Sequence, residues 1–289
     1  MDHSKHLLDH LTQIIKTQTG LCSQDHDVIE NPRAEARAII RYFLSEQACF
    51  YSSDHIDKNI LQRMENIAYH RAQHTPMAYL LGEKDFYNLT LKQSPSALIA
   101  RCDSEILVES AISFVLNTLK KKHPMFLDLG TGSGCLLLAC LKNLPMAQGL
   151  GSDCSIEALK LARQNAQINK LDQRCRFILS DWTQNIKSSF DVILCNPPYI
   201  PTQIIATLQY EVSAHEPHLA LDGGPKGLDP YLKLAQQLKK IMMPSSRCFI
   251  EFGEHQLNEL KLIFAAHHYR IIDVKKDLAG HPRCLILGL

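Results

Sequence analysis

The chain has 289 residues, of which 45% are hydrophobic and 21% are charged. This is the composition of a folded globular protein, and it excludes a largely disordered chain. With 31 Lys and Arg against 30 Asp and Glu, the formal charge of +1 excludes a strong overall attraction to nucleic acid or to an anionic membrane.

The first part of the chain is predicted to contain helices only. Apolar residues recur at helical spacing in three stretches, which run from Leu7 to Ile15, from Ala36 to Leu44 and from Ile56 to Ile67. Asn31-Pro32 marks the start of the second helix, because proline fits the first helical turn, and Asp54 is the expected cap of the third. We expect residues 1–75 to form a small helical domain that presents a surface rather than a catalytic cleft.

Residues 76–103 have a different pattern. Turn-forming residues recur, and the short apolar–polar alternation from Phe86 to Leu91 predicts a β-hairpin linker. Charge also divides near this point. Residues 1–85 carry 9 Lys and Arg against 12 Asp and Glu, whereas the remainder carries 22 against 18.

From Ser104 onward, strands and helices alternate. One helix is expected at 104–121, and another follows a glycine-rich turn at 130–134. Further helices are expected at 155–169, 230–242 and 254–266. One strand is expected at 125–129, and a second is expected to end near Asp153. Further strands are expected at 176–179, 190–195, 248–252, 271–274 and 284–287. Repeated βα units predict an α/β fold with a mostly parallel, doubly wound sheet.

A glycine-rich turn, Leu127-Asp128-Leu129-Gly130-Thr131-Gly132-Ser133-Gly134, follows the first of these strands and opens a helix. Alternate glycines let the backbone approach a ligand, and the helix start offers free N–H donors. Asp153 ends the next strand, where its carboxylate can bind a ribose diol. The spacing is G-x-G-x-G rather than G-x-G-x-x-G. A ligand-free tight turn and a nicotinamide or flavin site are the alternatives.

A second motif, Asn196-Pro197-Pro198-Tyr199, directly follows the strand at 190–195. Two prolines make a rigid turn at the carboxyl edge of the sheet and leave their carbonyls as acceptors. Asn196 adds an amide and Tyr199 a flat face. Together these residues predict a socket for a planar –NH2 group.

Other residues indicate less. Ten cysteines never form a C-x-x-C pair, which favours free thiols in a reducing cytoplasm and no structural zinc. His215 and His218 flank Glu216-Pro217, but no third ligand has suitable spacing, so we expect no metal site. The N-terminus does not look like a secretory signal, and no apolar run is long enough to span a membrane.

The two motifs together, DLGTGSG at 128–134 and NPPY at 196–199, resemble the S-adenosylmethionine-dependent amino-methyltransferases. Nearly the whole chain resembles the HemK/PrmC family, the glutamine N5-methyltransferases that act on peptide chain release factors. Further family-like stretches are YLLG at 79–82, the segment 153–166, SDW at 180–182, EP at 216–217, the segment 220–231, EFGEHQ at 251–256 and DLAGHPR at 277–283.

The resemblance implies a Rossmann-like class I methyltransferase with a mostly parallel seven-stranded sheet. It implies three parts: a substrate-recognition domain at 1–75, a hairpin linker at 76–103 and the methyltransferase domain at 104–289. The implied enzyme transfers a methyl group from S-adenosylmethionine to N5 of the glutamine in the Gly-Gly-Gln motif of class I release factors. S-adenosylhomocysteine is the product, the release factor is the partner, and the cytoplasm is the compartment.

The resemblance also implies roles for individual residues. The turn Gly130, Thr131, Gly132, Ser133 and Gly134 would wrap the methionine and ribose parts of the cofactor, and Asp153 would hold the ribose hydroxyls. Trp182 would lie against the adenine, with Asp181 near its amino group; core packing is the alternative for Trp182. Asn196, with Pro197, Pro198 and Tyr199, would hold the substrate amide, and Asn196 would also border the cofactor.

One segment departs from the family. The usual pattern I-P-R-P-E-T-E is here Ile99-Ala100-Arg101-Cys102-Asp103-Ser104-Glu105. Both prolines are absent, so we expect a less preorganised segment beside the active site.

Two further classes compete with this interpretation. An N6-adenine methyltransferase on DNA or RNA would use the same socket on a flipped base, but neither the charge nor the acidic N-terminal part favours direct nucleic-acid binding. A non-catalytic module is disfavoured by the intact motifs. Within the first class, a ribosomal-protein glutamine methyltransferase is the close alternative.

Overall fold

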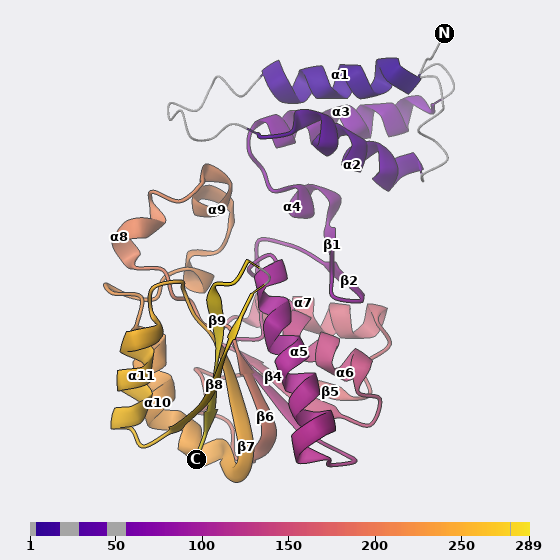
Figure 1. Ribbon diagram of the computed structural model, residues 1–289. Helices are drawn as coiled ribbons and strands as arrows, with labels where there is room; N and C mark the ends of the chain where they lie inside the picture. The colour runs from indigo at the N-terminus through magenta and orange to yellow at the C-terminus, as the bar shows by residue number, and fades with distance from the viewer. Residues whose placement is uncertain (1–3, 18–28, 45–55, 278) are drawn as a thin grey trace. The chain divides into compact units, whose positions relative to one another are not determined.

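The fold is described from a computed structural model of the chain, which covers residues 4–17, 29–44, 56–277 and 279–289 (Figure 1). These residues divide into two compact units. One contains residues 1–82 together with 208–215, and the other contains residues 83–207 and 216–289.

The first unit is built from α1 (Ser4–Thr17), α2 (Pro32–Leu44) and α3 (Lys58–Ala72), followed by the short α4 (Met77–Leu81). The apolar faces predicted from the helical spacing meet in one core, with Leu11, Ile39 and Met64 fully buried. The segment carrying α9 (Tyr210–His215) also belongs to this unit, although in sequence it follows the fourth strand of the seven-stranded sheet in the other unit. The sequence pattern did not indicate this association.

Helix caps in this unit follow the sequence in one case and differ in another. The Asn31 side chain accepts a hydrogen bond from the Ala34 N–H at 3.0 Å, and Pro32 occupies the first position of α2, as predicted. The third helix begins at Lys58, and Asp57 caps it by accepting from Asn59 and Ile60. The predicted cap, Asp54, lies outside the described residues.

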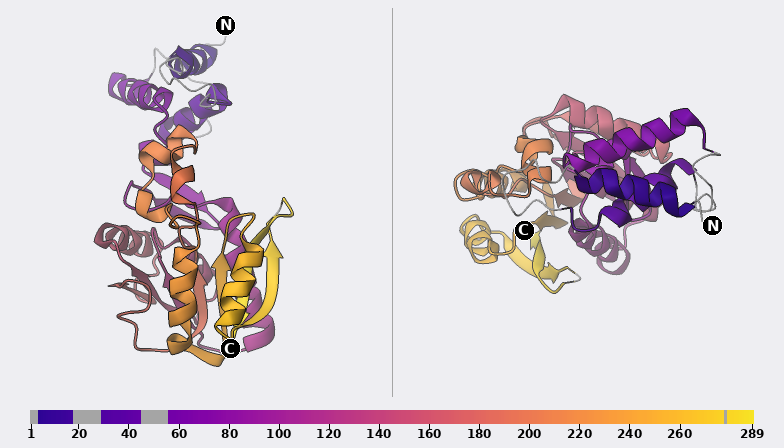
Figure 2. Two further views of the ribbon diagram at one scale, coloured as in Figure 1. Left: turned by 90° about the vertical axis from the view of Figure 1, so that its left-hand side faces the viewer. Right: turned by 90° about the horizontal axis from the view of Figure 1, so that it is seen from above.

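The second unit opens with a hairpin of β1 (Glu83–Phe86) and β2 (Leu89–Lys92), paired antiparallel. Its main sheet has seven strands in the order β5-β4-β3-β6-β7-β9-β8, and only β9 runs antiparallel to its neighbours. The left view of Figure 2 shows the last two strands side by side at one margin of this sheet. The strands are β3 (Met125–Leu129), β4 (Gln148–Asp153), β5 (Cys175–Leu179), β6 (Phe190–Cys195), β7 (Met242–Glu251), β8 (Arg270–Lys276) and β9 (Pro282–Gly288).

Helices cover both faces of the sheet, which confirms the predicted doubly wound α/β class (Figure 1). One face is covered by α5 (Glu105–Ser113), α6 (Cys135–Asn143) and α7 (Ile156–Ile168), and the other by α10 (Asp229–Gln237) and α11 (Leu257–Ala266). Neighbouring strand residues alternate between the two cores: Phe126 packs in the first and Leu127 in the second. Because β3 and β6 are adjacent, their carboxyl ends bring the two sequence motifs together.

Candidate active site

A cavity of about 830 Å³ opens at the carboxyl ends of β3, β4 and β6. This volume lies in the range of sites for small molecules and cofactors. Nine of the twelve residues that we predicted for the site line it, namely Gly130, Thr131, Gly132, Ser133, Asp153, Asp181, Trp182, Asn196 and Pro198. Gly134, Pro197 and Tyr199 lie beside it in the two motifs without lining it.

The glycine-rich turn forms one wall of the cavity because its backbone takes a conformation that side chains disfavour. Gly130 and Gly132 have φ of +68° and +54°. A Cβ at Gly130 would lie 3.9 Å from the Trp182 ring, and one at Gly132 would lie 3.6 Å from Ala97. The missing side chains therefore leave a shallow cradle between this turn, the indole and the segment at 95–101.

Asp153 projects from the end of β4 toward the same turn. Its Oδ2 accepts from the Gly132 N–H at 2.9 Å and its Oδ1 accepts from the Ser155 N–H at 2.9 Å. Burial raises the pKa of this carboxyl, and the backbone hydrogen bonds oppose the rise. A carboxylate has about four lone-pair positions, so Asp153 retains acceptor capacity for two hydroxyls of a ligand.

Trp182 stands on a constrained turn after β5. Its φ of +50° is in the left-handed region that disfavours residues with a bulky side chain. Ser180 holds this turn, since its hydroxyl donates to the Trp182 carbonyl at 2.9 Å and accepts from the Asn185 N–H at 3.1 Å. The indole both packs against the apolar core and lines the cavity, so the two interpretations of this residue are compatible.

The second motif forms the opposite wall. Asn196 follows the last residue of β6, and its Nδ2 donates to the Ser104 hydroxyl at 3.2 Å. Among the described residues, no hydrogen bond uses the Asn196 Oδ1 or the Pro197 carbonyl. Two acceptors at this position remain available to a ligand with two N–H groups.

The turn at Pro198 and Tyr199 is fixed by contacts with Gln256 and Gly227. Gln256 Nε2 donates to the Tyr199 carbonyl at 2.9 Å and to the Gly227 carbonyl at 3.0 Å. A Cβ at Gly227 would lie 2.2 Å from the Tyr199 carbonyl oxygen, so this close backbone approach requires glycine. Burial, followed by the nearby Glu251 carboxyl, raises the pKa of Tyr199 far above its ordinary value, and the phenol stays neutral.

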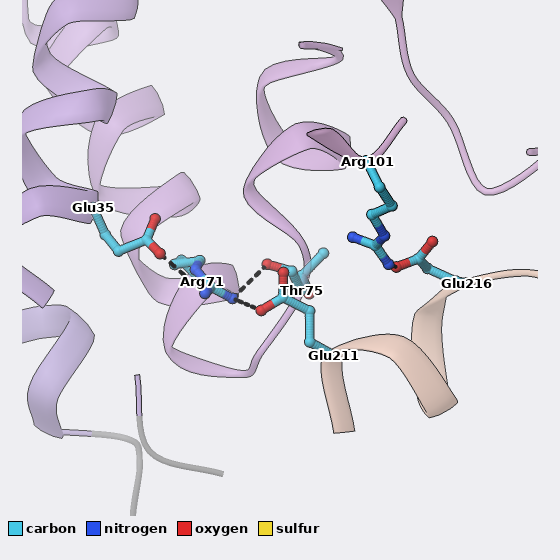
Figure 3. A network of polar contacts seen from close by, with 6 residues as sticks. All are labelled: Glu35, Arg71, Thr75, Arg101, Glu211 and Glu216. Carbon is cyan, nitrogen blue, oxygen red and sulfur yellow. Dashed lines mark hydrogen bonds and ion pairs between the residues drawn. The ribbon is translucent and has the colours of Figure 1, made fainter. Parts of the chain in front are cut away.

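The segment 99–105, which lacks the two family prolines, contributes Ile99, Ala100, Arg101 and Ser104 to the cavity lining and is anchored by Glu216. This carboxylate, which is 1% exposed, accepts from the Ile99 N–H at 3.1 Å and pairs with the Arg101 guanidinium (Figure 3). Two bonds to one buried carboxylate restrain the segment where prolines do not. The role of Glu216 has little signal in the sequence, where the residue stands out only as a charged residue beside a proline.

Two buried carboxyl groups lie behind the walls of the cavity. Asp128 Oδ2 accepts from the Thr131 hydroxyl at 2.6 Å, while its Oδ1 has no hydrogen-bond partner among the described residues. Desolvation raises the pKa of Asp128 to about 7, and it raises the pKa of Glu251 to about 7 as well. Our sequence analysis did not predict a role for Glu251, whose residue type inside an apolar strand was the available indication.

This arrangement fits a nucleoside that carries an amino-acid tail. The carboxylate of Asp153 suits a diol, the indole of Trp182 suits a flat ring, and the glycine cradle leaves backbone close to the ligand. Among the described residues, no group of three or more His, Cys, Asp or Glu could hold a metal ion, and no described helix could cross a membrane. Eight cysteines in that part of the chain are free, while Cys22 and Cys49 lie outside it.

Comparisons with known proteins agree with this geometry. The family described as Methyltransferase small domain matches residues 104–216. The release factor glutamine methyltransferase of Agrobacterium fabrum strain C58 is 40% identical over 216 residues, which cover 74% of this chain and 75% of that protein. The protein of the same description from Rhodospirillum rubrum is 36% identical over 89% of this chain and 79% of its own length.

Similarity to solved structures concerns the fold alone. The crystal structure of a methyltransferase from Pyrococcus furiosus superimposes with a TM-score of 0.52 at 20% identity, and it covers 71% of this chain and 91% of that one. The seven-stranded sheet with helices on both faces is therefore shared with methyltransferases whose sequences have diverged widely.

Proposed function

Since the chain belongs to the release factor glutamine methyltransferase family, we propose that it transfers a methyl group from S-adenosylmethionine to the side-chain nitrogen of a release-factor glutamine. The glutamine is the one in the Gly-Gly-Gln motif, and N5 is the atom that receives the methyl group. One observation carries this proposal: a single cavity contains both the glycine-rich turn with Asp153 and the unsatisfied acceptor of Asn196.

S-adenosylmethionine supplies an electrophilic methyl group when it is bound. We assign its ribose hydroxyls to Asp153, its adenine to Trp182 with Asp181 near the amino group, and its amino-acid part to the turn at 130–134. Asn196 borders the same space from the other wall. These residues hold a dipolar ligand through accepted hydrogen bonds and ring contact rather than through a cation.

The substrate amide needs orientation more than it needs a base. Its nitrogen lone pair is delocalised into the carbonyl, and no side chain removes an amide proton at neutral pH. Asn196 Oδ1 and the Pro197 carbonyl each accept one N–H, which turns the nitrogen toward the methyl group. Orientation of this kind can supply up to ~7–11 kcal/mol in favourable systems. The neutral Tyr199 limits the space for the amide plane.

We further propose that residues 1–75 recognise the release factor, with residues 76–103 as linker and 104–289 as the methyltransferase domain. The support is a division of labour: the cavity is lined entirely by residues of the sheet-containing unit, while the helical unit has a separate apolar core. A translation factor as substrate, together with free thiols, favours the cytoplasm as the compartment.

The test is a methyl-transfer assay with labelled S-adenosylmethionine and three separate acceptors. These are a release factor with its Gly-Gly-Gln loop, a ribosomal protein fraction and duplex DNA. We expect label only in the release factor, and peptide mass spectrometry should locate one added methyl group on the glutamine. A release factor whose glutamine is replaced by alanine is the control. Label in DNA alone, or in ribosomal protein alone, would refute the proposed substrate.

A further inference from the structure

Glu251 is a buried carboxyl group directly behind the substrate-binding wall of the cavity. It is the last residue of β7, which pairs in parallel with β6 so that Ile250 lies opposite Cys195. The next residues along the two strands are Glu251 and Asn196, which brings them side by side. Glu251 is 2% exposed, and this burial places its carboxyl behind the wall rather than on its surface.

Three side chains lie together behind this wall. Asn196 Nδ2 donates to the Ser104 hydroxyl at 3.2 Å, and Ser104 is itself only 2% exposed. Both Ser104 and Asn196 lower the pKa of the Glu251 carboxyl against the rise that burial causes, so both polar side chains lie near this acid. Ser104 therefore accepts from the amide, and Glu251 places a further acceptor beside the two of them.

The surroundings hold Glu251 in place and keep it an acceptor. The Tyr231 hydroxyl, fully buried, donates to the Glu251 carbonyl at 3.0 Å and fixes the backbone. Arg283 stabilises the ionised form of the carboxyl and Asp103 disfavours it. Glu251 Oε2 has no hydrogen-bond partner among the described residues. The group thus retains lone pairs for the asparagine amide in either protonation state.

The orientation of the Asn196 amide decides whether the socket works. The terminal torsion of asparagine is broad and roughly two-fold, so the oxygen and the nitrogen can exchange places at little cost. The substrate –NH2 group offers two donors and needs acceptors. An asparagine turned the wrong way would place its own N–H groups against them, leaving donors unsatisfied in a dry site.

We propose that Glu251 and Ser104 are positioning residues that hold the Asn196 amide nitrogen, so that its oxygen faces the substrate glutamine. The proposal rests on the proposed function and deepens it: the acceptor in the socket is set by a carboxyl group that the substrate never touches. The serine stands where the family pattern has threonine, and it retains the hydroxyl that accepts from Asn196.

The test compares Glu251→Met with Glu251→Gln in the full-length protein. Methionine keeps the length of the side chain without an acceptor, whereas glutamine keeps a carbonyl oxygen that can accept from Asn196. We expect kcat of Glu251→Met to fall about tenfold to a hundredfold, because the acceptor beside the Asn196 amide nitrogen is lost. The KM for the release factor and the affinity for S-adenosylhomocysteine should change less than about twofold, and Glu251→Gln should keep most of kcat.

Two further variants separate positioning from folding. Ser104→Ala should lower kcat by about threefold to tenfold, and Ser104→Thr should restore it. Ile250→Val, on the same strand but packed in the core on the opposite face of the sheet, is the matched control for a changed strand and should keep kcat per folded molecule. Unchanged kcat in Glu251→Met, equal loss in both Glu251 variants, or parallel loss of cofactor affinity would overturn the proposal. Failure of the proposed function would differ, since the unmodified protein would then leave the release factor unlabelled.

Discussion

Arg71 in the helical unit and two acids of the sheet-containing unit, Asp128 and Glu251, are buried charged groups with different surroundings. In the helical unit, Arg71 is 6% exposed and is surrounded by acceptors (Figure 3). Its guanidinium donates to Glu211 at 2.8 Å, to Glu35 at 3.1 Å and to the Thr75 carbonyl at 3.3 Å. In the sheet unit, Asp128 and Glu251 are equally buried but form no ion pair among the described residues, and burial raises the pKa of each to about 7.

The difference between these buried groups reflects different roles in the two units. Arg71 ties together α2, α3 and the separate segment that carries α9, so its charge stabilises the association of three stretches of chain. The buried acids of the sheet unit are costly to ionise, and they lie behind residues that face a ligand. A cation paired with two carboxylates is typical of structural support, whereas buried acids without an ion pair beside a cavity are typical of a functional site.

The largest expected effect is a loss of methyl transfer in the sheet-containing unit while its fold is kept. Asn196→Ala should lower methyl transfer about a thousandfold or more, because it removes the acceptor that orients the substrate amide. Steady-state kinetics measure the loss, and calorimetry with S-adenosylhomocysteine should show affinity within about threefold of the unmodified protein. Asp153→Ala, on the other wall, is the matched control. It should lose affinity for S-adenosylhomocysteine, while its methyl transfer should fall less than that of Asn196→Ala. Loss of cofactor affinity in Asn196→Ala would assign that residue to the cofactor site instead.

The next effect tests the cost of a buried acid. Burial raises the pKa of Glu251 from 4.5 to about 7, so the folded state binds a proton that the unfolded state has lost between these values. Stability from this group is therefore complete below about pH 4.5 and falls by about 3 kcal/mol as the pH rises to 7. Glu251→Gln should remove this fall, making the variant more stable at pH 8 by about that amount.

Urea unfolding of the unmodified protein and of Glu251→Gln at pH 4.5, 6 and 8 measures this difference. Asp128 has a pKa raised in the same direction and is present in both proteins, so its contribution cancels in the comparison. A difference in unfolding free energy that stays constant from pH 4.5 to 8 would contradict the expectation.

The smallest effect belongs to the helical unit. Arg71→Met should destabilise that unit by about 1–2 kcal/mol, since the loss of a buried cation is softened by the partial exposure of its partners. The side chains of Glu35 and Glu211 are 25% and 34% exposed, so water can solvate both once the guanidinium is gone. Hydrogen exchange in α2 and α3 should increase while cofactor affinity stays unchanged. Arg37→Met, an exposed change on α2, is the control.

Much of the fold could be predicted because its determinants are local. The apolar spacing of α1 to α3, the seven strands and the turns that end them all follow from short stretches of sequence. Boundaries shifted where a cap competes with periodicity, as at Asp57, or where the last turn tightens, as at Leu238–Ile241 after α10. The helices α8 (Thr202–Ile205) and α9 were not predicted, because four to six residues are too few for a periodic pattern.

The sequence by itself determined the α/β class and nine residues that line the cavity. Six of them lie in the two motifs, each of which is a turn directly after a strand, and Asp153 ends a strand; Asp181 and Trp182 followed from the family resemblance. The tertiary structure alone decided which distant residues support the two motifs. The pairing of β6 with β7 places Glu251 beside Asn196. The tertiary fold brings Ser104 into contact with Asn196 and Glu216 into contact with Ile99, at the walls of the cavity. A buried acid in one stretch and a serine in another carry no pattern of their own. Their partners follow only from how strands pair and from the need of each buried polar group for a hydrogen bond.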